Sequence, residues 1–406
     1  MNNEHKKLNV PNLRFKEFQG EWEKQKLCDI SSIIGRIGFR GYTTNDIVEK
    51  GMGAIALSPT NIVNNQLTYD KDNTYISMSK YEESPEIMIK RGDVIFVKTG
   101  STVGKVAYVD KMICKTTLNP QVVVLKDIKC DNYILSVIMS TRKFQNKIQR
   151  ITVGGAVPTL SQMAMGNIFI SLPAAKEQEK ISKFISLIDE RIVTQNKIIE
   201  DFKKLKAAII DYAINSLDSG FVKFGSLYEM AGEGGTPTTS NASFYDNGKI
   251  PFIKIDDLKK KYLTENKDFI TELGLQKSSA WLVPSRSILF SNGATIGEIT
   301  ITTYPVCTKQ GILGIVPKPN IDVEFLYYFM SSSYFKKAVS RIVTEGTMKT
   351  AYLKDINNIR CPIPIKEKQQ DIAKMPSTLN SKIDFEQSIL KLFCSQKQYL
   401  LRQMFM

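Results

Sequence analysis

Two long stretches of the chain repeat apolar residues every seven positions, with a second apolar residue four positions later and charged residues between them. A narrow seam of this kind, about 35 residues long, is typical of helices that pack lengthwise. Each helix would reach roughly 50 Å at 1.5 Å per residue. The seam positions are Ile181, Ile185, Ile188, Ile192, Gln195, Ile199, Phe202 and Ile209 in the first stretch, and Ile372, Leu379, Ile383, Leu390, Phe393 and Leu400 in the second. The pattern predicts an antiparallel helix pair, and a surface helix on one globular core is the alternative.

Pro376 lies inside the second helical stretch. A proline there removes a backbone hydrogen bond and clashes with the preceding turn, at a cost of ~3 kcal/mol. Proline is well tolerated only in the first turn of a helix. We therefore expect the second helix to break or kink at this point and to restart near Pro376.

The β-rich parts of the chain also contain an internal sequence repeat. "VIFVKTGSTVGKVAYV" (94–109) matches "SILFSNGATIGEITIT" (287–302), so that Gly100 pairs with Gly293 and Gly104 with Gly297. Both pairs are 193 residues apart. Glycines between two β-rich runs are typical of a strand–turn–strand in which the backbone bends sharply or closely approaches another group.

A second match precedes each long helix. "NIFISLPAAKEQEKI" (167–181) resembles "NIRCPIPIKEKQQDI" (358–372), which pairs Pro173 with Pro364 and Gln178 with Gln369, now 191 residues apart. We expect the two-residue change of register in the loop around 160–166. The halves predict an α+β fold with these divisions: an N-terminal tail (1–20), a β-rich domain (21–173), a first long helix (174–217), a second β-rich domain (218–364) and a second long helix (365–406).

"KTGSTVGK" (98–105) resembles a phosphate-binding loop, but the spacing differs. A P-loop has four residues between its glycines and a hydroxyl after its lysine. Here three residues separate Gly100 from Gly104, and Val106 stands at the hydroxyl position. The second copy replaces Lys105 with Glu298. A nucleotide phosphate site is therefore disfavoured, and a tight turn is favoured.

Charge then points to a polyanionic partner. Lys and Arg outnumber Asp and Glu by 55 to 41, which gives a net charge of +14. Nucleic acid is the leading partner class and a membrane surface is the rival. No apolar run approaches the ~20 residues of a membrane-spanning helix. The start, "MNNEHKKLNV", contains no apolar signal core, so we expect a cytoplasmic protein.

Candidate catalytic chemistry is sparse. The six cysteines have no C-x-x-C spacing and no histidine near them, which disfavours a zinc site and a disulfide framework. His5 is the single histidine and lies in a polar tail, so histidine-based catalysis has no plausible residue. We expect no catalytic residue, no metal site and no cofactor.

Several stretches resemble the specificity subunit of bacterial type I restriction–modification systems. They are "NVPNLRFKEFQGEWEKQKL" (9–27), "GEGGTPTTSNASFYDNGKIPFIKIDDL" (232–258), the two glycine turns, the helix leads "PAAKEQ" (173–178) and "PIKEKQ" (364–369), and the ending "YLLRQMF" (399–405). The segment 33–47 is a less typical domain start, and Pro376 and Asn380 depart from the usual helical run.

The resemblance implies two target-recognition domains separated by a coiled-coil spacer of two antiparallel helices, with a pseudo-twofold internal repeat. Such a subunit does no chemistry. It reads a two-part double-stranded DNA site, one half per domain, and holds two methyltransferase subunits and, in the full complex, restriction–translocase subunits. The sequence agrees with the absence of chemistry, because "NPQV" (119–122) lacks the second proline and the aromatic residue of a DNA amino-methyltransferase motif.

Reading DNA requires cations for phosphates and polar side chains for base edges. Loops rich in such residues supply the predicted DNA contacts, although each residue alone could equally lie in a solvated loop. The candidates are Arg36, Arg40, Tyr42, Thr43, Lys98, Ser101, Thr102 and Lys105 in the first domain, and Thr236, Thr238, Lys254, Asp256, Ser291, Asn292, Thr295, Lys309, Gln310, Thr347 and Lys349 in the second.

Three alternatives remain at this point. A stand-alone DNA nuclease would cleave with magnesium, and "DDLK" (256–259) contains a D-x-K fragment but no convincing companion carboxylate. A coiled-coil scaffold that does not bind DNA would show no salt-dependent DNA affinity. A specificity subunit of a fused or minimal restriction system would differ in its partner genes.

Overall fold

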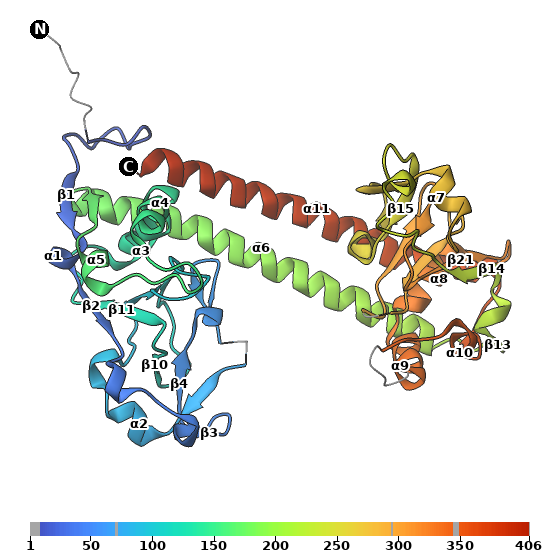
Figure 1. The fold of residues 1–406 in the computed structure, drawn as a ribbon, viewed down its shortest axis with the longest axis horizontal. Coiled ribbons are helices and arrows are strands. Elements are labelled where there is room, and N and C mark those ends of the chain that lie inside the picture. Colours follow the sequence, from blue (N-terminus) through green and yellow to red (C-terminus); the bar gives the residue numbers. More distant parts are fainter. Residues whose placement is uncertain (1–8, 70–71, 294, 344–348, 406) are drawn as a thin grey trace, which may run out of the picture. The chain divides into compact units, whose positions relative to one another are not determined.

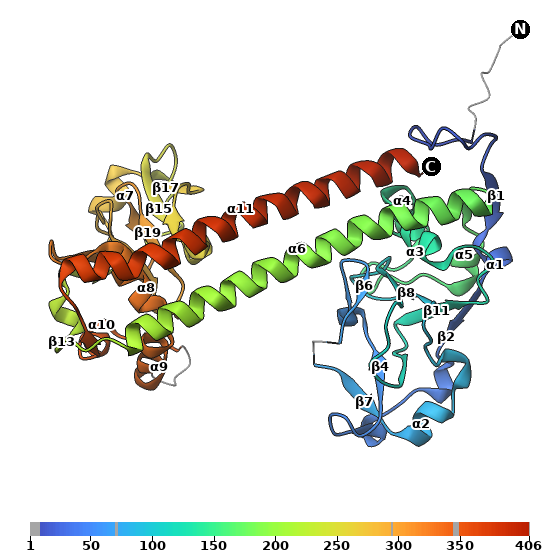
Figure 2. The same cartoon turned by 180° about the vertical axis from the view of Figure 1, so that it is seen from behind.

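The computed structural model describes residues 9–69, 72–293, 295–343 and 349–405. The chain divides into two compact units, seen from opposite sides in Figures 1 and 2. Unit 1 comprises Met1–Thr194 and Leu390–Met406, and unit 2 comprises Gln195–Ile389. Two long helices, α6 (Ala175–Asn215) and α11 (Lys366–Met404), each contribute one end to unit 1 and the other to unit 2.

Unit 1 contains a six-stranded sheet in the order β2-β11-β8-β9-β6-β5, a four-stranded sheet in the order β10-β4-β7-β3, and the antiparallel pair β1 and β12. Its strands are β1 (Glu23–Lys26), β2 (Ser32–Gly35), β3 (Ile47–Val48), β4 (Ala54–Leu57), β5 (Ile62–Val63), β6 (Gln66–Leu67), β7 (Thr74–Ile76), β8 (Val94–Val97), β9 (Val106–Tyr108), β10 (Thr116–Leu118), β11 (Val122–Lys126) and β12 (Phe169–Leu172). Its helical segments are α1 (Leu27–Ile30), α2 (Met78–Glu82), α3 (Asn132–Ser140), α4 (Arg142–Ile151), α5 (Gln162–Gly166) and the short 3-10 turns η1 (Gly38–Arg40), η2 (Thr44–Asp46), η3 (Pro59–Asn61) and η4 (Pro85–Ile87).

The apolar run "VIFV" of β8 is fully buried because both faces of its sheet are covered. Val94 and Phe96 belong to a core formed with α3, α4 and the start of α6. Ile95 and Val97 point the other way, into a core shared with β4 and β10 of the four-stranded sheet. Alternation along one strand thus joins two packed layers, and Figure 1 shows α3 and α4 beside the start of α6.

Unit 2 repeats this plan with a five-stranded sheet in the order β14-β21-β18-β19-β16, a three-stranded sheet in the order β17-β15-β20, and the pair β13 and β22. Its strands are β13 (Phe221–Lys223), β14 (Tyr228–Glu233), β15 (Ile250–Ile253), β16 (Tyr262–Leu263), β17 (Asp268–Ile270), β18 (Ile288–Ser291), β19 (Ile299–Thr302), β20 (Cys307–Thr308), β21 (Ile312–Pro317) and β22 (Arg360–Pro362). Its helical segments are α7 (Glu272–Gln276), α8 (Val323–Ser331), α9 (Ser333–Ile342), α10 (Leu353–Ile356), η5 (Phe224–Ser226), η6 (Ala242–Phe244) and η7 (Ile255–Lys259). Ile288 and Phe290 of β18 face the core with α8 and α9, whereas Leu289 faces the opposite core.

The predicted duplication is confirmed by equivalent hydrogen bonds in the two units. Gln178 Oε1 accepts the N–H of Asp131 at 2.8 Å, and its Nε2 donates to the Pro173 carbonyl at 2.8 Å. In unit 2, Gln369 Oε1 accepts the N–H of Asp322 at 2.8 Å and Nε2 donates to the Pro364 carbonyl at 2.9 Å. Each glutamine therefore ties the start of a long helix to the segment that caps α3 or α8.

The change of register between the repeats lies earlier than expected. Strand β9 matches β19 with an offset of 193, because Val106 and Ile299 begin these strands and both face the helical core of their unit. At α3 and α8 the offset is already 191, because Asp131 caps the start of the first and Asp322 caps the start of the second. The two-residue difference therefore falls between β9 and α3, and the expectation around 160–166 is wrong.

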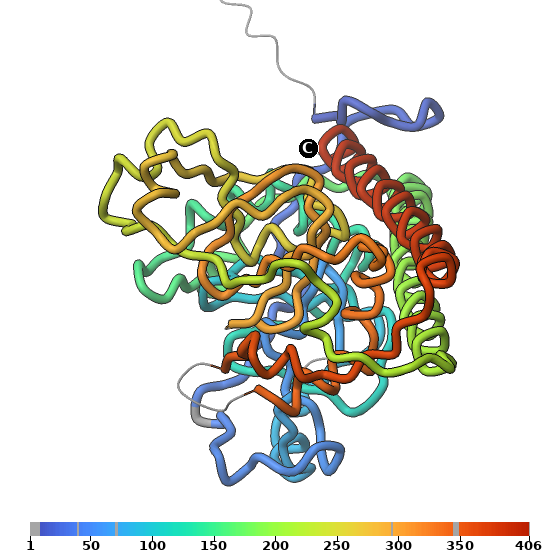
Figure 3. Tube along the Cα trace, turned by 90° about the vertical axis from the view of Figure 1, so that its right-hand side faces the viewer, coloured from blue at the N-terminus to red at the C-terminus, as the bar shows by residue number. Residues whose placement is uncertain are grey.

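The long helices form the predicted seams within each unit (Figure 3). In unit 1, Ile181, Ile185 and Ile188 of α6 share a core with Leu400 of α11. In unit 2, Gln195 Nε2 donates to the Glu386 carboxylate and carbonyl. These two residues are equivalent positions of the repeats, 191 apart. Antiparallel packing of duplicated helices brings such positions together.

The expected break at Pro376 is wrong, because α11 runs without interruption through it. Pro376 itself is buried, and Ala373 on the preceding turn packs into the core of unit 2. The next residue, Ser377, lies within hydrogen-bond distance of Lys261 Nζ at 3.0 Å and of the Tyr328 hydroxyl at 3.1 Å. Tertiary contacts on both sides of the proline hold the helical backbone, which offsets the unfavourable local propensity.

Candidate nucleic-acid interface

The turn between β8 and β9 is fixed to the helical layer of unit 1. Gly100 and Gly104 have φ of +102° and +99°, a region that favours glycine. Gln145 of α4 donates from Nε2 to the Gly104 carbonyl at 2.8 Å, and a Cβ on Gly104 would lie 2.3 Å from Gln145 Oε1. The strand–turn–strand is therefore as predicted, and the second glycine is required by the close approach of Gln145.

The candidate DNA-contacting side chains on this turn differ in their exposure and in whether they are already hydrogen-bonded within the protein. Ser101 is exposed, and Lys98 and Thr102 are half-buried. Lys105 is exposed as a residue, but its Nζ donates to the carbonyls of Pro59 and Ile62 at 3.4 and 3.2 Å. The lysine that resembled a phosphate ligand thus ties the turn to η3.

The equivalent turn in unit 2, between β18 and β19, places two of its three candidates inside the protein. Ser291 is fully buried, and its Oγ accepts the N–H of Glu298 at 2.8 Å. Asn292 is 1% exposed, and its Nδ2 donates to the Ala351 carbonyl at 3.3 Å. Thr295 is exposed. In this state of the chain Ser291 and Asn292 shape the turn, and Thr295 is the side chain that it presents to solvent.

The segment at 36–43 is built around a buried arginine. Arg36 is 6% exposed, and it donates to the Leu118 carbonyl at 2.9 Å and to Thr117 Oγ1 at 3.1 Å. Burial lowers the pKa of its guanidinium, which the Tyr42 ring, 5.5 Å away, partly opposes. Arg40 forms an ion pair with Glu86 at 3.6 Å, and Thr43 is exposed and closes η2 through Asp46.

The remaining unit 2 candidates lie mostly at the surface. Thr236 Oγ1 accepts the N–H of Gln310 at 3.3 Å, which joins two candidate loops. Lys254 forms an ion pair with Asp268 at 2.8 Å and Asp256 with Lys259 at 3.0 Å. The further exposed candidates are Thr238, Lys309, Gln310 and Lys349. Thr347 lies outside the described residues.

Sequence reasoning missed two cationic clusters. Lys261, whose side chain is 2% exposed, forms an ion pair with Glu324 and lies over the rings of Tyr262, Tyr327 and Tyr328. The second cluster lines a cavity in unit 1 and includes Arg142 and Lys143 of α4. The basic, strongly amphipathic sequence "RKFQNKIQRI" of α4 was a readable signal for the second cluster. Nothing in the sequence separated Lys261 from the other lysines.

The described residues contain no group of three or more His, Cys, Asp or Glu side chains that could hold a metal ion. Within the same residues, no helix combines the length and apolar character that crossing a bilayer requires. The six cysteines are free thiols. Cations, amides and hydroxyls lie on loops of two similar units, and this chemistry suits recognition of a polyanion.

A family model described as the type I restriction modification DNA specificity domain matches the chain twice, at residues 19–203 and 217–392. The chain belongs to this family. It is the specificity subunit of a type I restriction–modification system, a DNA-recognition component and not the catalyst. This finding supports the sequence-based identification over a stand-alone nuclease.

Known specificity subunits resemble the chain along most of its length. The MjaIX specificity subunit of Methanocaldococcus jannaschii is 23% identical over 376 residues, which cover 86% of this chain and 85% of that one. The HindI specificity subunit of Haemophilus influenzae is 19% identical over 410 residues, with 80% and 86% covered. A crystal structure of the S subunit from M. genitalium has the same fold, with a TM-score of 0.54, 16% identity, and 98% and 99% of the two chains covered.

Proposed function

We propose that each unit of this specificity subunit reads one half of a bipartite double-stranded DNA target. The observation that carries the proposal is the duplication of the framework, down to the Gln178 and Gln369 bridges of the same geometry. Two equivalent frameworks with different loop residues would read two different half-sites. The corresponding domains are residues 21–173 and 218–364, with helices at 174–217 and 365–406.

The exposed loop residues supply the reading chemistry. Lysines such as Lys309 and Lys349 neutralise phosphates and give affinity that falls as salt rises. Hydroxyl and amide side chains, among them Ser101, Thr295 and Gln310, meet base edges in the grooves. The buried candidates Arg36, Ser291 and Asn292 act by holding the loops that carry these side chains.

The long helices act as a spacer that fixes the gap between the half-sites. Helix α6 has 41 residues and α11 has 39. At 1.5 Å per residue each is about 60 Å long. Surfaces near the helix ends hold two methyltransferase subunits, one for each unit, and restriction–translocase subunits join the full complex. The subunit acts in the bacterial cytoplasm, where its DNA target lies.

Co-expression with the methyltransferase encoded beside the chain tests the proposal. Methylated adenines mapped across the host genome should fall in a split motif, with two specified halves and an unspecified gap. A continuous motif, or methylation that does not depend on the chain, would contradict it. Purified chain should also bind duplex DNA with an affinity that falls steeply with salt.

A further inference from the structure

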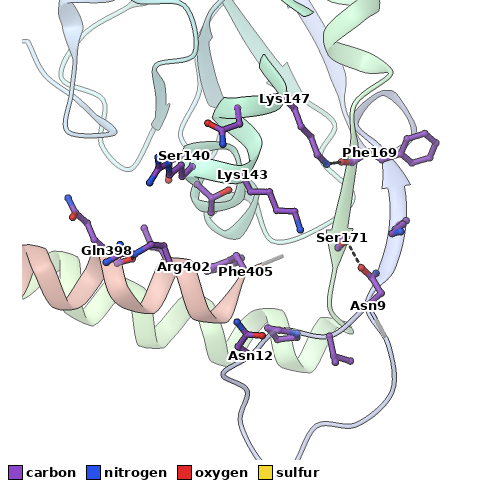
Figure 4. Close-up of a pocket in the computed structure, with 17 residues that line it drawn as sticks. Asn9, Asn12, Ser140, Lys143, Lys147, Phe169, Ser171, Gln398, Arg402 and Phe405 are labelled. Carbon is purple, nitrogen blue, oxygen red and sulfur yellow. Dashed lines mark hydrogen bonds between the residues drawn. The ribbon is translucent and has the colours of Figure 1, made fainter. Parts of the chain in front are cut away.

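A basic cavity of about 1130 Å³ opens in unit 1 between α4, the last turns of α11 and the N-terminal segment. Figure 4 shows its lining side chains. Its five cationic residues are Lys24, Arg142, Lys143, Lys147 and Arg402. No Asp or Glu is among the lining residues, and within the described part of the chain no ion pair joins these five to a carboxylate.

The cations of this cavity are held close together without an anion. Lys147 Nζ donates to the Phe169 carbonyl at 2.6 Å, and Arg402 Nε donates to the Gln398 carbonyl at 3.2 Å. Burial lowers the pKa of the Lys147 amine, and the positive charges of Lys143 and Lys24 lower it further. A bound anion would relieve this repulsion.

Unit 2 shows which group fits the equivalent place. The offset of 191 makes Ser333, the first residue of α9, the counterpart of Arg142, the first residue of α4. The same offset makes Asp211 the counterpart of Arg402. Asp211 Oδ1 accepts the N–H of Ser333 at 2.7 Å, so a carboxylate caps the start of α9.

Unit 1 lacks that carboxylate. Arg402 stands where the aspartate would be, and among the described residues the N–H of Arg142 has no hydrogen-bond partner. The start of a helix carries unpaired N–H groups and a partial positive charge. Two arginines and a lysine beside this helix start therefore make a site that is complementary to a carboxylate.

We propose that the cavity receives an acidic side chain, with an apolar neighbour, from the methyltransferase subunit. This contact would be the one by which one methyltransferase subunit docks on unit 1, and the proposal rests on the proposed function. The carboxylate lies against Arg142, Lys143 and Arg402, as Asp211 does at Ser333. The apolar neighbour packs on Phe405 and Leu401, which also line the cavity.

A protein carboxylate fits better than a DNA phosphate for two reasons. The apolar lining by Phe169, Leu401 and Phe405 has no complement in a phosphate backbone. In addition, Gln145 points from another side of α4 to Gly104, on the turn proposed to meet DNA. Lys143 and Lys147, each two positions from Gln145 in the sequence, lie on a different face of that helix.

The substitution Arg402→Asp tests the proposal, because it restores in unit 1 the carboxylate that unit 2 carries at Asp211. The new carboxylate should cap Arg142 and fill the cavity. We expect the affinity of the full chain for the purified methyltransferase subunit to fall by about tenfold or more. Its affinity for duplex DNA in the same buffer should match that of Lys391→Asp, which places a similar charge change on an exposed position of α11.

The outcomes are distinct. Loss of DNA binding with methyltransferase binding retained would mean that the cavity takes phosphate, which overturns the proposal. No change in either affinity relative to Lys391→Asp also overturns it. Should Arg402→Asp fail to fold, the double variant Arg142→Gln, Lys143→Gln is judged by the same criteria. Failure of the proposed function itself would be seen in the unsubstituted chain, as absence of both affinities.

Discussion

Removing the glutamine that ties each long helix to its unit should destabilise that unit and leave the other intact. Gln178 is 8% exposed and Gln369 is 1% exposed. Each bridges the N–H of an aspartate that caps a helix and the carbonyl of a proline. Gln178→Ala breaks the bridge in unit 1, Gln369→Ala breaks it in unit 2, and Gln370→Ala is the exposed control on the same helix as Gln369.

The magnitude follows from the groups left behind. Each substitution leaves one part-buried donor and one buried or part-buried acceptor without its partner, at roughly 1–2 kcal/mol each, the lower part of the range for buried groups. The free energy of unfolding of the affected unit should therefore fall by about 2–4 kcal/mol. With a urea dependence near 2 kcal/mol per molar, the unfolding midpoint should fall by about 1–2 M. The loss at Gln369 should be the larger, because its Nε2 also donates to the Asn320 carbonyl at 3.3 Å.

The chain supplies its own reporters for this assay. It has two tryptophans, Trp22 in unit 1 and Trp281 in unit 2. In a Trp281→Phe background, the fluorescence of Trp22 follows unit 1 alone, and a Trp22→Phe background follows unit 2. Gln178→Ala should shift the Trp22 transition, and Gln369→Ala should shift the Trp281 transition.

Two results would refute this reasoning. If neither glutamine substitution lowered its midpoint more than Gln370→Ala does, the bridges would carry no net stability. If each substitution lowered both transitions equally, the units would unfold as one, and the division into two frameworks would not describe the energetics of the chain.

Three further predictions follow from the helices, the thiols and the buried lysine. Inserting four residues after Asn196 in α6, and four at the equivalent position of α11, lengthens each helix by about 6 Å. The gap between the two half-sites of the mapped methylation motif should grow by one or two base pairs, at ~3.4 Å each. An unchanged gap would count against the helices acting as a spacer. Burial raises the pKa of the Cys361 thiol to about 12, so roughly one Cys361 side chain in 10⁴ is a thiolate at pH 8. Alkylation mapped by mass spectrometry should label the exposed Cys28 first, and the rate at Cys361 should rise about tenfold for each unit of pH. Equally early labelling of both cysteines would contradict the burial of Cys361. Lys261→Met should lower the free energy of unfolding by about 2–3 kcal/mol, because Glu324 loses its buried partner, and an unchanged unfolding midpoint would show that the pair contributes nothing.

The framework was predictable from sequence because it is periodic and duplicated. The seam residues from Ile181 to Leu400 form the expected antiparallel packing, and the Gln178 and Gln369 pairing marks a real structural equivalence. Pro376 was misjudged, since the contacts of Ser377 and Ala373 that hold the helix come from distant parts of the chain. Local propensity is a weak guide where tertiary contacts dominate.

The candidate site was less predictable than the framework. Arg36, Ser291 and Asn292 look like surface polar residues in sequence, but all three are buried and bonded inside the protein. The exchange of Asp211 for Arg402 between the repeats was likewise hidden. Its meaning depends on the start of α4 or α9, which is far away in sequence and adjacent in space.

The most direct test of the central claim exchanges one recognition domain. Residues 222–349 would be replaced by the corresponding segment of another specificity subunit, and methylated adenines would be mapped after co-expression with the methyltransferase. Two units that read independently predict a new sequence in one half of the motif, with the other half and the gap unchanged. A change in both halves would contradict the account.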